Sequence, residues 1–160
     1  MFLWFVGLSV AAVWIVFQSP ALDYRLVAAG SLLPWLDGVT GGPWVLHTLL
    51  GSVAALALVM LATQRRRLVR RRWLGIPIGM FLHLVLDGVF TRSALFWWPF
   101  LGSRAAAFSG PLLELDRPLG VTLLMEVAGA AALAWLWSGF GLADPTRRRE
   151  LLTTGRLPRL

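Results

Sequence analysis

Four long apolar runs, separated by polar and charged segments, dominate the hydrophobic pattern of this chain. A helix rises about 1.5 Å per residue and needs roughly 20 apolar residues to cross a bilayer, so these runs predict membrane-spanning helices. The first run has no basic segment before it, and the Gln-Ser-Pro that ends it is a poor cleavage site. We therefore expect a retained helix there and not a signal peptide. The four runs are residues 2–17, 45–63, 74–90 and 119–142.

Two further apolar stretches are predicted to lie at the membrane surface. Residues 24–38 are too few to cross easily, which favours a re-entrant or interfacial helix. Residues 93–118 contain a tandem pair of tryptophans, a residue type typical of the membrane–water boundary. If residues 24–36 did cross, the N-terminus would move to the outer side. The pattern predicts an all-α, polytopic membrane helical bundle over residues 1–144, with about four transmembrane helices.

Composition agrees with a membrane protein. Hydrophobic residues make up 58% of the 160 residues, and the mean hydropathy is +0.71. So little polar sequence leaves no room for a large soluble domain beside the apolar runs. The absence of cysteine excludes both a disulfide framework and a thiolate metal site.

Charge placement orients the predicted bundle. All fifteen basic residues are arginine, and most lie in two clusters beside predicted helix ends, within residues 65–72 and 147–149. The positive-inside rule puts both clusters in the cytoplasm. Four crossings then give cytoplasmic N- and C-termini in a bacterial cytoplasmic (inner) membrane, with residues 145–160 as a basic tail. Membrane lipids are the expected partners, and the helix-flanking arginines, which account for most of the +7 charge, do not indicate nucleic acid.

Six ionisable residues lie in or beside the apolar runs, where a charge costs a few kcal/mol. His83 and Asp87 are four residues apart and share one helix face. The predicted orientation brings Asp37 and His47 toward the same outer side. Histidine and carboxylate ligands suit Zn²⁺, with Mn²⁺ or Fe²⁺ as alternatives. The full set is Asp23, Asp37, His47, His83, Asp87 and Glu126.

Each of these residues also has a structural explanation. His83 and Asp87 form a common type of intrahelical polar pair. His47 is placed to begin a helix or to reach the interface, and Asp37 precedes a glycine and suits a turn. Glu126 suits a hydrogen bond to a neighbouring helix. The residues alone leave a metal site and a structural network about equally supported.

Four short motifs, in order, resemble the YdjM-type membrane-bound metal-dependent hydrolases, a group of LexA-regulated inner-membrane proteins. They are GSLLPWLD, WVLHTLLGS, HLVLDGVF and LFWWPF, and the resemblance covers roughly residues 23–100. The resemblance implies Asp37, His47, His83 and Asp87 as metal-site residues, with Asp23 a weaker candidate. The chain departs from the family pattern at Trp35, where the family has an aspartate, and at Gly42-Pro43-Trp44, which replaces a His-Arg turn. The ligands that are left suffice for one metal ion.

Three functions compete at this point. The first is a membrane-embedded hydrolase in which a metal-activated water attacks a lipid-like or phosphoester substrate at the outer face, with Asp87 or Glu126 as general base. The second is a non-catalytic membrane subunit or scaffold with a degenerate metal site. Its small residues 129–134 would allow packing against another copy or a membrane protein partner. The third, a bis-His haem protein, is disfavoured because His47 and His83 lie at different depths.

Overall fold

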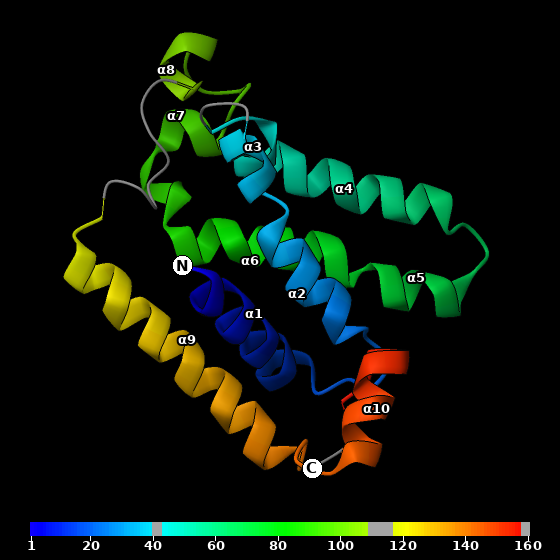
Figure 1. The fold of residues 1–160 in the computed structure, drawn as a ribbon. Helices are drawn as coiled ribbons and strands as arrows, with labels where there is room; N and C mark the ends of the chain where they lie inside the picture. The colour runs from blue at the N-terminus through cyan, green and yellow to red at the C-terminus, as the bar shows by residue number, and fades with distance from the viewer. Residues whose placement is uncertain (40–42, 109–116, 158–160) are drawn as a thin grey trace.

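The described residues of the computed structural model, 1–39, 43–108 and 117–157, fold into helices and contain no β-strand (Figure 1). The all-α expectation is confirmed. The expectations for Gly42, for residues 109–116 of the second interfacial stretch and for the last three residues of the tail lie outside these ranges. The helices are α1 Phe2–Phe17, α2 Tyr24–Leu32, α3 Trp35–Val39, η1 Val45–His47, α4 Leu49–Ala62, α5 Arg67–Trp73, α6 Gly75–Asp87, η2 Val89–Thr91, α7 Ser93–Phe96, α8 Arg104–Phe108, α9 Leu119–Gly139 and α10 Pro145–Thr154.

Helix α6 lies at the centre, with α2 and α4 packed beside it, while α1 packs against α2 and α9 (Figure 1). Two of the contacts are backbone to backbone and depend on glycine. A Cβ atom on Gly79 would lie 2.2 Å from the carbonyl oxygen of Val27 in α2. A Cβ atom on Gly7 would lie 2.3 Å from the carbonyl oxygen of Gly129 in α9. Small residues thus set the distance between helices, as in membrane helix pairs.

One end of the bundle, which we call the arginine end, collects the start of α2 and the C-terminal segment. The backbone N–H of Tyr24 donates to the carbonyl oxygen of Gly155 over 2.8 Å. Helix α10 begins at its N-cap Asp144, and Leu157 beyond it is buried. The end of the expected tail, residues 155–157, therefore contacts the start of α2, whereas α10 itself has no buried residue.

The opposite end, which we call the site end, holds the N-terminus. The indole N–H of Trp4 donates to the carbonyl oxygen of Leu86 over 3.2 Å, near the end of α6. Glu126 accepts from the backbone N–H of Leu3 at 2.9 Å and pairs with the amino group of Met1 at 3.0 Å. In the bundle, residue 1 lies at the site end and residue 157 at the arginine end, whereas four traverses would put both on one side; the membrane location of the termini stays a prediction. The reason is that α2 and α3 run from the arginine end to the site end and add one traverse to the four expected.

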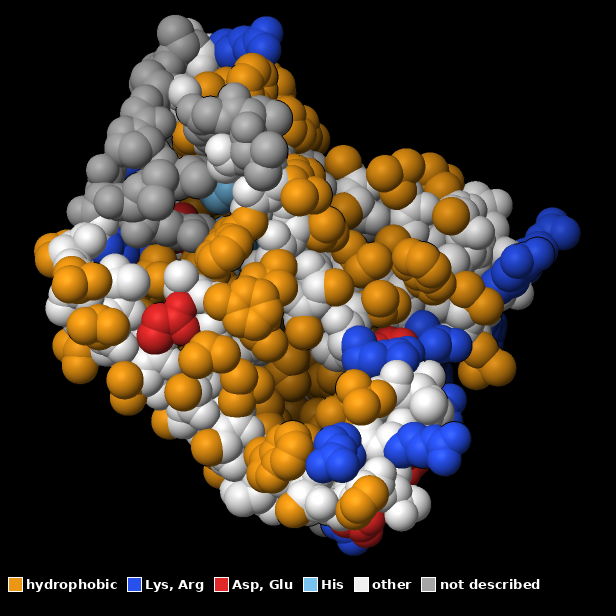
Figure 2. Space-filling model, in the orientation of Figure 1, with side chains coloured by type: hydrophobic (Ala, Val, Ile, Leu, Met, Phe, Trp, Pro, Cys, Tyr) orange, Lys and Arg blue, Asp and Glu red, His pale blue; other side chains and the backbone are white. Residues whose placement is uncertain are grey.

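Only α9, among the described helices, is long and apolar enough to cross a membrane by length and composition, and it has 21 residues. Helices α1 and α4 are apolar but have 16 and 14 residues. The polytopic expectation is thus not confirmed by helix length. Apolar side chains nevertheless cover much of the visible surface (Figure 2). Exposed apolar area on this scale marks a surface that contacts lipid or another protein.

Candidate metal centre

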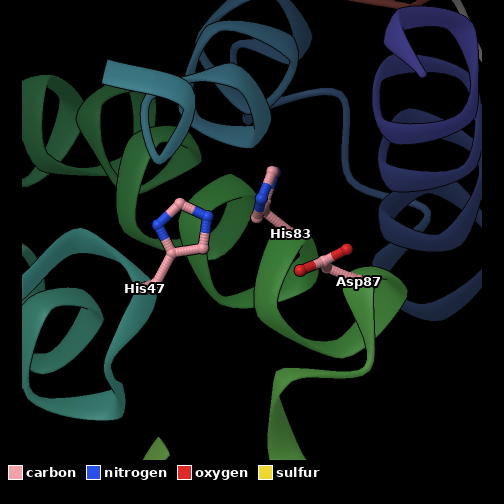
Figure 3. Close-up of side chains that lie close together, drawn as sticks. All are labelled: His47, His83 and Asp87. Atoms are coloured by element: carbon pink, nitrogen blue, oxygen red, sulfur yellow. The ribbon is translucent and has the colours of Figure 1, made fainter. Parts of the chain in front are cut away.

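Three side chains from two distant segments of the sequence meet at the site end: His47 from η1, and His83 and Asp87 from α6 (Figure 3). Each is at most 1% exposed. One ligand atom from each lies within 4.8 Å of the other two. This is the grouping that the sequence predicted for these three residues.

His83 is held by the end of α2. Its Nδ1 lies 2.7 Å from the carbonyl oxygen of Ser31. Pro34 has no N–H and ends α2, and the last carbonyls of a helix have no partner within it, so the Ser31 oxygen is available to an outside donor. The imidazole also stacks on Phe5 of α1, with ring centroids 4.0 Å apart. Because a carbonyl only accepts, Nδ1 carries the proton, and Nε2 of the neutral ring is a lone-pair donor to a cation.

His47 is held by Asp37 of α3. The carboxylate Oδ2 lies 2.9 Å from His47 Nδ1 and accepts the backbone N–H groups of His47 at 3.1 Å and Trp44 at 2.9 Å. Thr48 directly after the histidine caps α4 by accepting from the N–H of Gly51 at 3.0 Å. These bonds hold the turn at η1, the His47 ring and the start of α4 in one arrangement. Nε2 of His47 is buried and has no hydrogen-bond partner among the described residues.

Asp87 is the last residue of α6. Gly88, with φ of +75°, ends the helix in the left-handed conformation that glycine adopts without strain. Arg117 binds the aspartate twice: its guanidinium lies 3.1 Å from Oδ1 and also donates to the backbone carbonyl. The carboxylate therefore keeps a fixed position at the helix end, one turn from His83.

These groups fit a divalent cation. Two imidazole Nε2 atoms and a carboxylate are all electron-pair donors, and three such ligands leave coordination positions for water, as in catalytic zinc sites. A carboxylate behind one histidine and a backbone carbonyl behind the other are the usual arrangement around metal-binding imidazoles. Ligands about 2.1 Å from one ion lie at most ~4.2 Å apart, so the group has to contract slightly from 4.8 Å on binding.

The structure separates the other predicted site residues from this group. Asp37 contacts His47 and is not itself one of the three grouped ligands. Asp23 lies at the arginine end, where it accepts from Arg25 and pairs with Arg72 at 3.4 Å. It caps the start of α2, about eight residues or ~12 Å along the helix from Ser31. Glu126 contacts the start of α1 and not the metal group.

The environment of Asp23 sets its ionisation. Burial would raise the pKa of its carboxyl, but the hydrogen bond and charge of Arg25, with a further bond from Arg72, outweigh that effect and hold the pKa below its usual value. The carboxylate is then an anion paired with arginines, which suits an ion pair that ties the start of α2 to Arg72 better than a metal ligand.

The haem alternative conflicts with the ring geometry. The imidazoles of His47 and His83 meet edge to face, with centroids 5.4 Å apart. Axial ligands bind on opposite faces of a macrocycle, so the porphyrin would have to lie between two rings that already touch.

Three contributors were missed from the sequence. Ser31 acts through a backbone carbonyl and Phe5 through ring stacking, and neither leaves a signal in the sequence. Arg117 does leave one. It lies apart from the two arginine clusters, in a segment that the predicted topology puts on the outer side, where the positive-inside rule disfavours arginine.

No family model, curated protein or solved structure matches this chain. The resemblance to the YdjM-type hydrolases therefore rests on the four motifs alone. The chemistry of the site has to be argued from its own residues.

Proposed function

We propose that this chain is a membrane-embedded hydrolase that binds one divalent metal ion, Zn²⁺ in the first place, through His47, His83 and Asp87. The observation that carries the proposal is the pair of imidazoles whose Nδ1 atoms are bound to Asp37 and to Ser31. Both rings are left with Nε2 as the ligand atom, in one buried group with a carboxylate. The ordered motifs shared with the YdjM-type hydrolases support the same assignment.

The protein residues would divide the work as follows. A metal ion bound here would supply an activated water at neutral pH and polarise the substrate. His47, His83 and Asp87 bind it, and Asp37 and Ser31 orient the two imidazoles. Of the two predicted general bases, Asp87 lies in the metal group, whereas Glu126 is engaged by the start of α1. The geometry thus supports a catalytic role for Asp87 alone of these two.

The membrane setting is part of the proposal. α9 meets the length and apolarity of a transmembrane helix, and α1, α4 and α6 expose large apolar side chains. With the arginine end in the cytoplasm of a bacterial inner membrane, the site end and the N-terminus face outward. A lipid-like ester or phosphoester would then reach the site from the outer leaflet.

Elemental analysis of detergent-purified protein tests the metal site. We expect close to one zinc per chain in the wild type, its loss in His83→Ala, and its retention in Asp144→Ala, a control at the arginine end whose side chain caps α10. Metal-loaded protein should then hydrolyse fluorogenic lipid esters or phosphoesters. Folded protein without bound metal after incubation with zinc, manganese and iron would refute the proposal.

A second candidate function is a non-catalytic membrane subunit with a structural metal. It is favoured by the burial of all three ligands to 1% exposure or less, which leaves little access for a substrate. Stoichiometric metal without hydrolysis of any lipid ester or phosphoester tested would favour this candidate. Copurification with another membrane protein would favour it further.

A further inference from the structure

An apolar groove lies between α1, α4 and α6. Its volume is about 460 Å³, within the range of roughly 300–1,000 Å³ of small-molecule sites. Its lining includes Val13, Val16, Leu56, Phe81 and Leu82. The α6 residues that line the groove lie on a different side of the helix from its glycines, which pack against α2.

We infer that this groove binds one acyl chain of an anionic phospholipid, the substrate class of the metal centre. The inference rests on the proposed function. Val16 and Phe81, which line the groove, are also exposed at the surface, so in a bilayer the groove opens among lipid chains. A hydrocarbon chain is the occupant that such an apolar lining selects.

Ser52 points to a ligand in the same groove. It is 4% exposed and lines the groove, and its hydroxyl has no hydrogen-bond partner among the described residues. A buried hydroxyl without a partner is costly, and an ester oxygen at the head of an acyl chain would satisfy it. Ser52 lies in the first turn of α4, the helix that begins directly after His47 and Thr48. The polar end of the lipid therefore lies toward the metal centre.

The charge at that end complements an anionic head group. Arg117 contacts Asp87, and the guanidinium of Arg104 lies 5.6 Å from the ring centroid of Trp44. The backbone N–H of Trp44 donates to Asp37. Both arginines are at the site end, away from the clusters that set topology. Arginine is the residue that best recognises phosphate oxygens, so a phosphate held here would lie beside the metal ligands.

Photolabelling tests the inference. The full chain is placed in phosphatidylcholine nanodiscs containing a small fraction of phosphatidylglycerol with a diazirine on its acyl chain. We expect label on groove residues of α4 and α6. Val53→Trp, which fills the groove, should lower that label about tenfold. The matched control Leu58→Trp, on the same helix outside the groove, should leave it unchanged. Arg104→Gln should remove the preference for phosphatidylglycerol over phosphatidylcholine in competition.

The outcomes separate this inference from the proposed function. Label spread evenly over the apolar faces and unaffected by Val53→Trp would overturn the groove as a lipid site, even if the protein binds zinc. Crosslinking of two chains through the groove would assign it to a second copy and would also overturn the inference. Specific label that persists in His83→Ala, a variant expected to lack metal, supports lipid binding. If the wild type also lacks metal, the hydrolase proposal fails while the lipid site stands.

Discussion

Asp37 offers the sharpest test of the metal centre, because it contacts a proposed ligand and not the ion. Its Oδ2 is the acceptor for three donors: the His47 ring, the His47 backbone and the Trp44 backbone, at 2.9–3.1 Å. Asp37→Asn keeps the size and one acceptor oxygen but removes the negative charge. The imidazole then has a weaker hydrogen-bond acceptor and a less basic Nε2.

The size of the effect follows from these contacts. Hydrogen bonds to charged groups contribute ~1.5–3 kcal/mol and neutral ones ~0.5–1.5 kcal/mol, so losing the charge costs on the order of 1 kcal/mol or more at the ring. Replacing the carboxylate behind a metal-binding histidine lowers metal affinity by about 10–100-fold. We therefore expect Asp37→Asn to raise the Kd for zinc within that range. Asp37→Ala should be worse, because it leaves three donors of the turn without their acceptor, at ~1–3 kcal/mol for each buried one.

A zinc competition titration against a chromophoric chelator in detergent measures the Kd, and thermal unfolding in chelator measures stability without metal. Asp144→Asn is the matched control at the arginine end and should leave the Kd unchanged. The reasoning is refuted if folded Asp37→Asn binds zinc as tightly as the wild type. It is also refuted if the control weakens zinc binding to the same extent.

Three further predictions concern the fold. Gly7→Ala should lower the unfolding temperature, by overpacking worth ~1–3 kcal/mol, since its Cβ would lie 2.3 Å from a carbonyl oxygen of α9; Gly120→Ala, with nothing within 4 Å, should not. Asp23→Asn should destabilise the protein at pH 7. The pKa of Asp23 is lower in the folded protein than in the unfolded chain, where it is about 3.9. Its contribution to the free energy of unfolding is therefore complete above the unfolded pKa and is lost as pH falls through the folded pKa. Thermal unfolding curves of the variant and the wild type should accordingly converge in acid. Because the chain has no cysteine, the single-cysteine variants Phe2→Cys and Arg71→Cys can each be labelled with a membrane-impermeant maleimide in right-side-out vesicles. We expect label only at Phe2, and equal labelling would contradict the opposed termini.

The sequence predicted the metal group where the chemistry is local or is carried by the motifs. His83 and Asp87 share a helix face because they are four residues apart, and this spacing alone placed them together. His47 was predicted from its side of the membrane and from the motif order. The contribution of Asp37 could not be read in the same way. It depends on a turn in which the backbone N–H groups of Trp44 and His47 and the ring of His47 all reach one carboxylate oxygen. No residue pattern in the sequence predicts that geometry.

Other features of the arrangement also have physical causes. Residues 24–38, predicted as a re-entrant or interfacial helix, form α2 and α3 on either side of a proline, and the two helices together run from one end of the bundle to the other. That one traverse moves the N-terminus to the site end. Asp23 was grouped with the metal residues through a family resemblance, although its neighbour Arg25 and its place before a helix both indicate a capping ion pair.

The proposed metal centre lies where helices end, and this placement explains how so apolar a chain builds a polar site. Backbone groups inside a helix are already bonded, whereas the last carbonyls are not. Because α2 ends at Leu32, before Pro34, the carbonyl of Ser31 is available to His83, and Gly88 ends α6 beside the Asp87 carbonyl that accepts from Arg117. The first break therefore supplies a backbone carbonyl as the partner of His83, and the second lets an arginine pair with Asp87. Because the ligands come from separate segments, the expected metal affinity depends on how the helices pack. The zinc titration of Asp37→Asn therefore reports on the metal ligands and on the packing that holds them together.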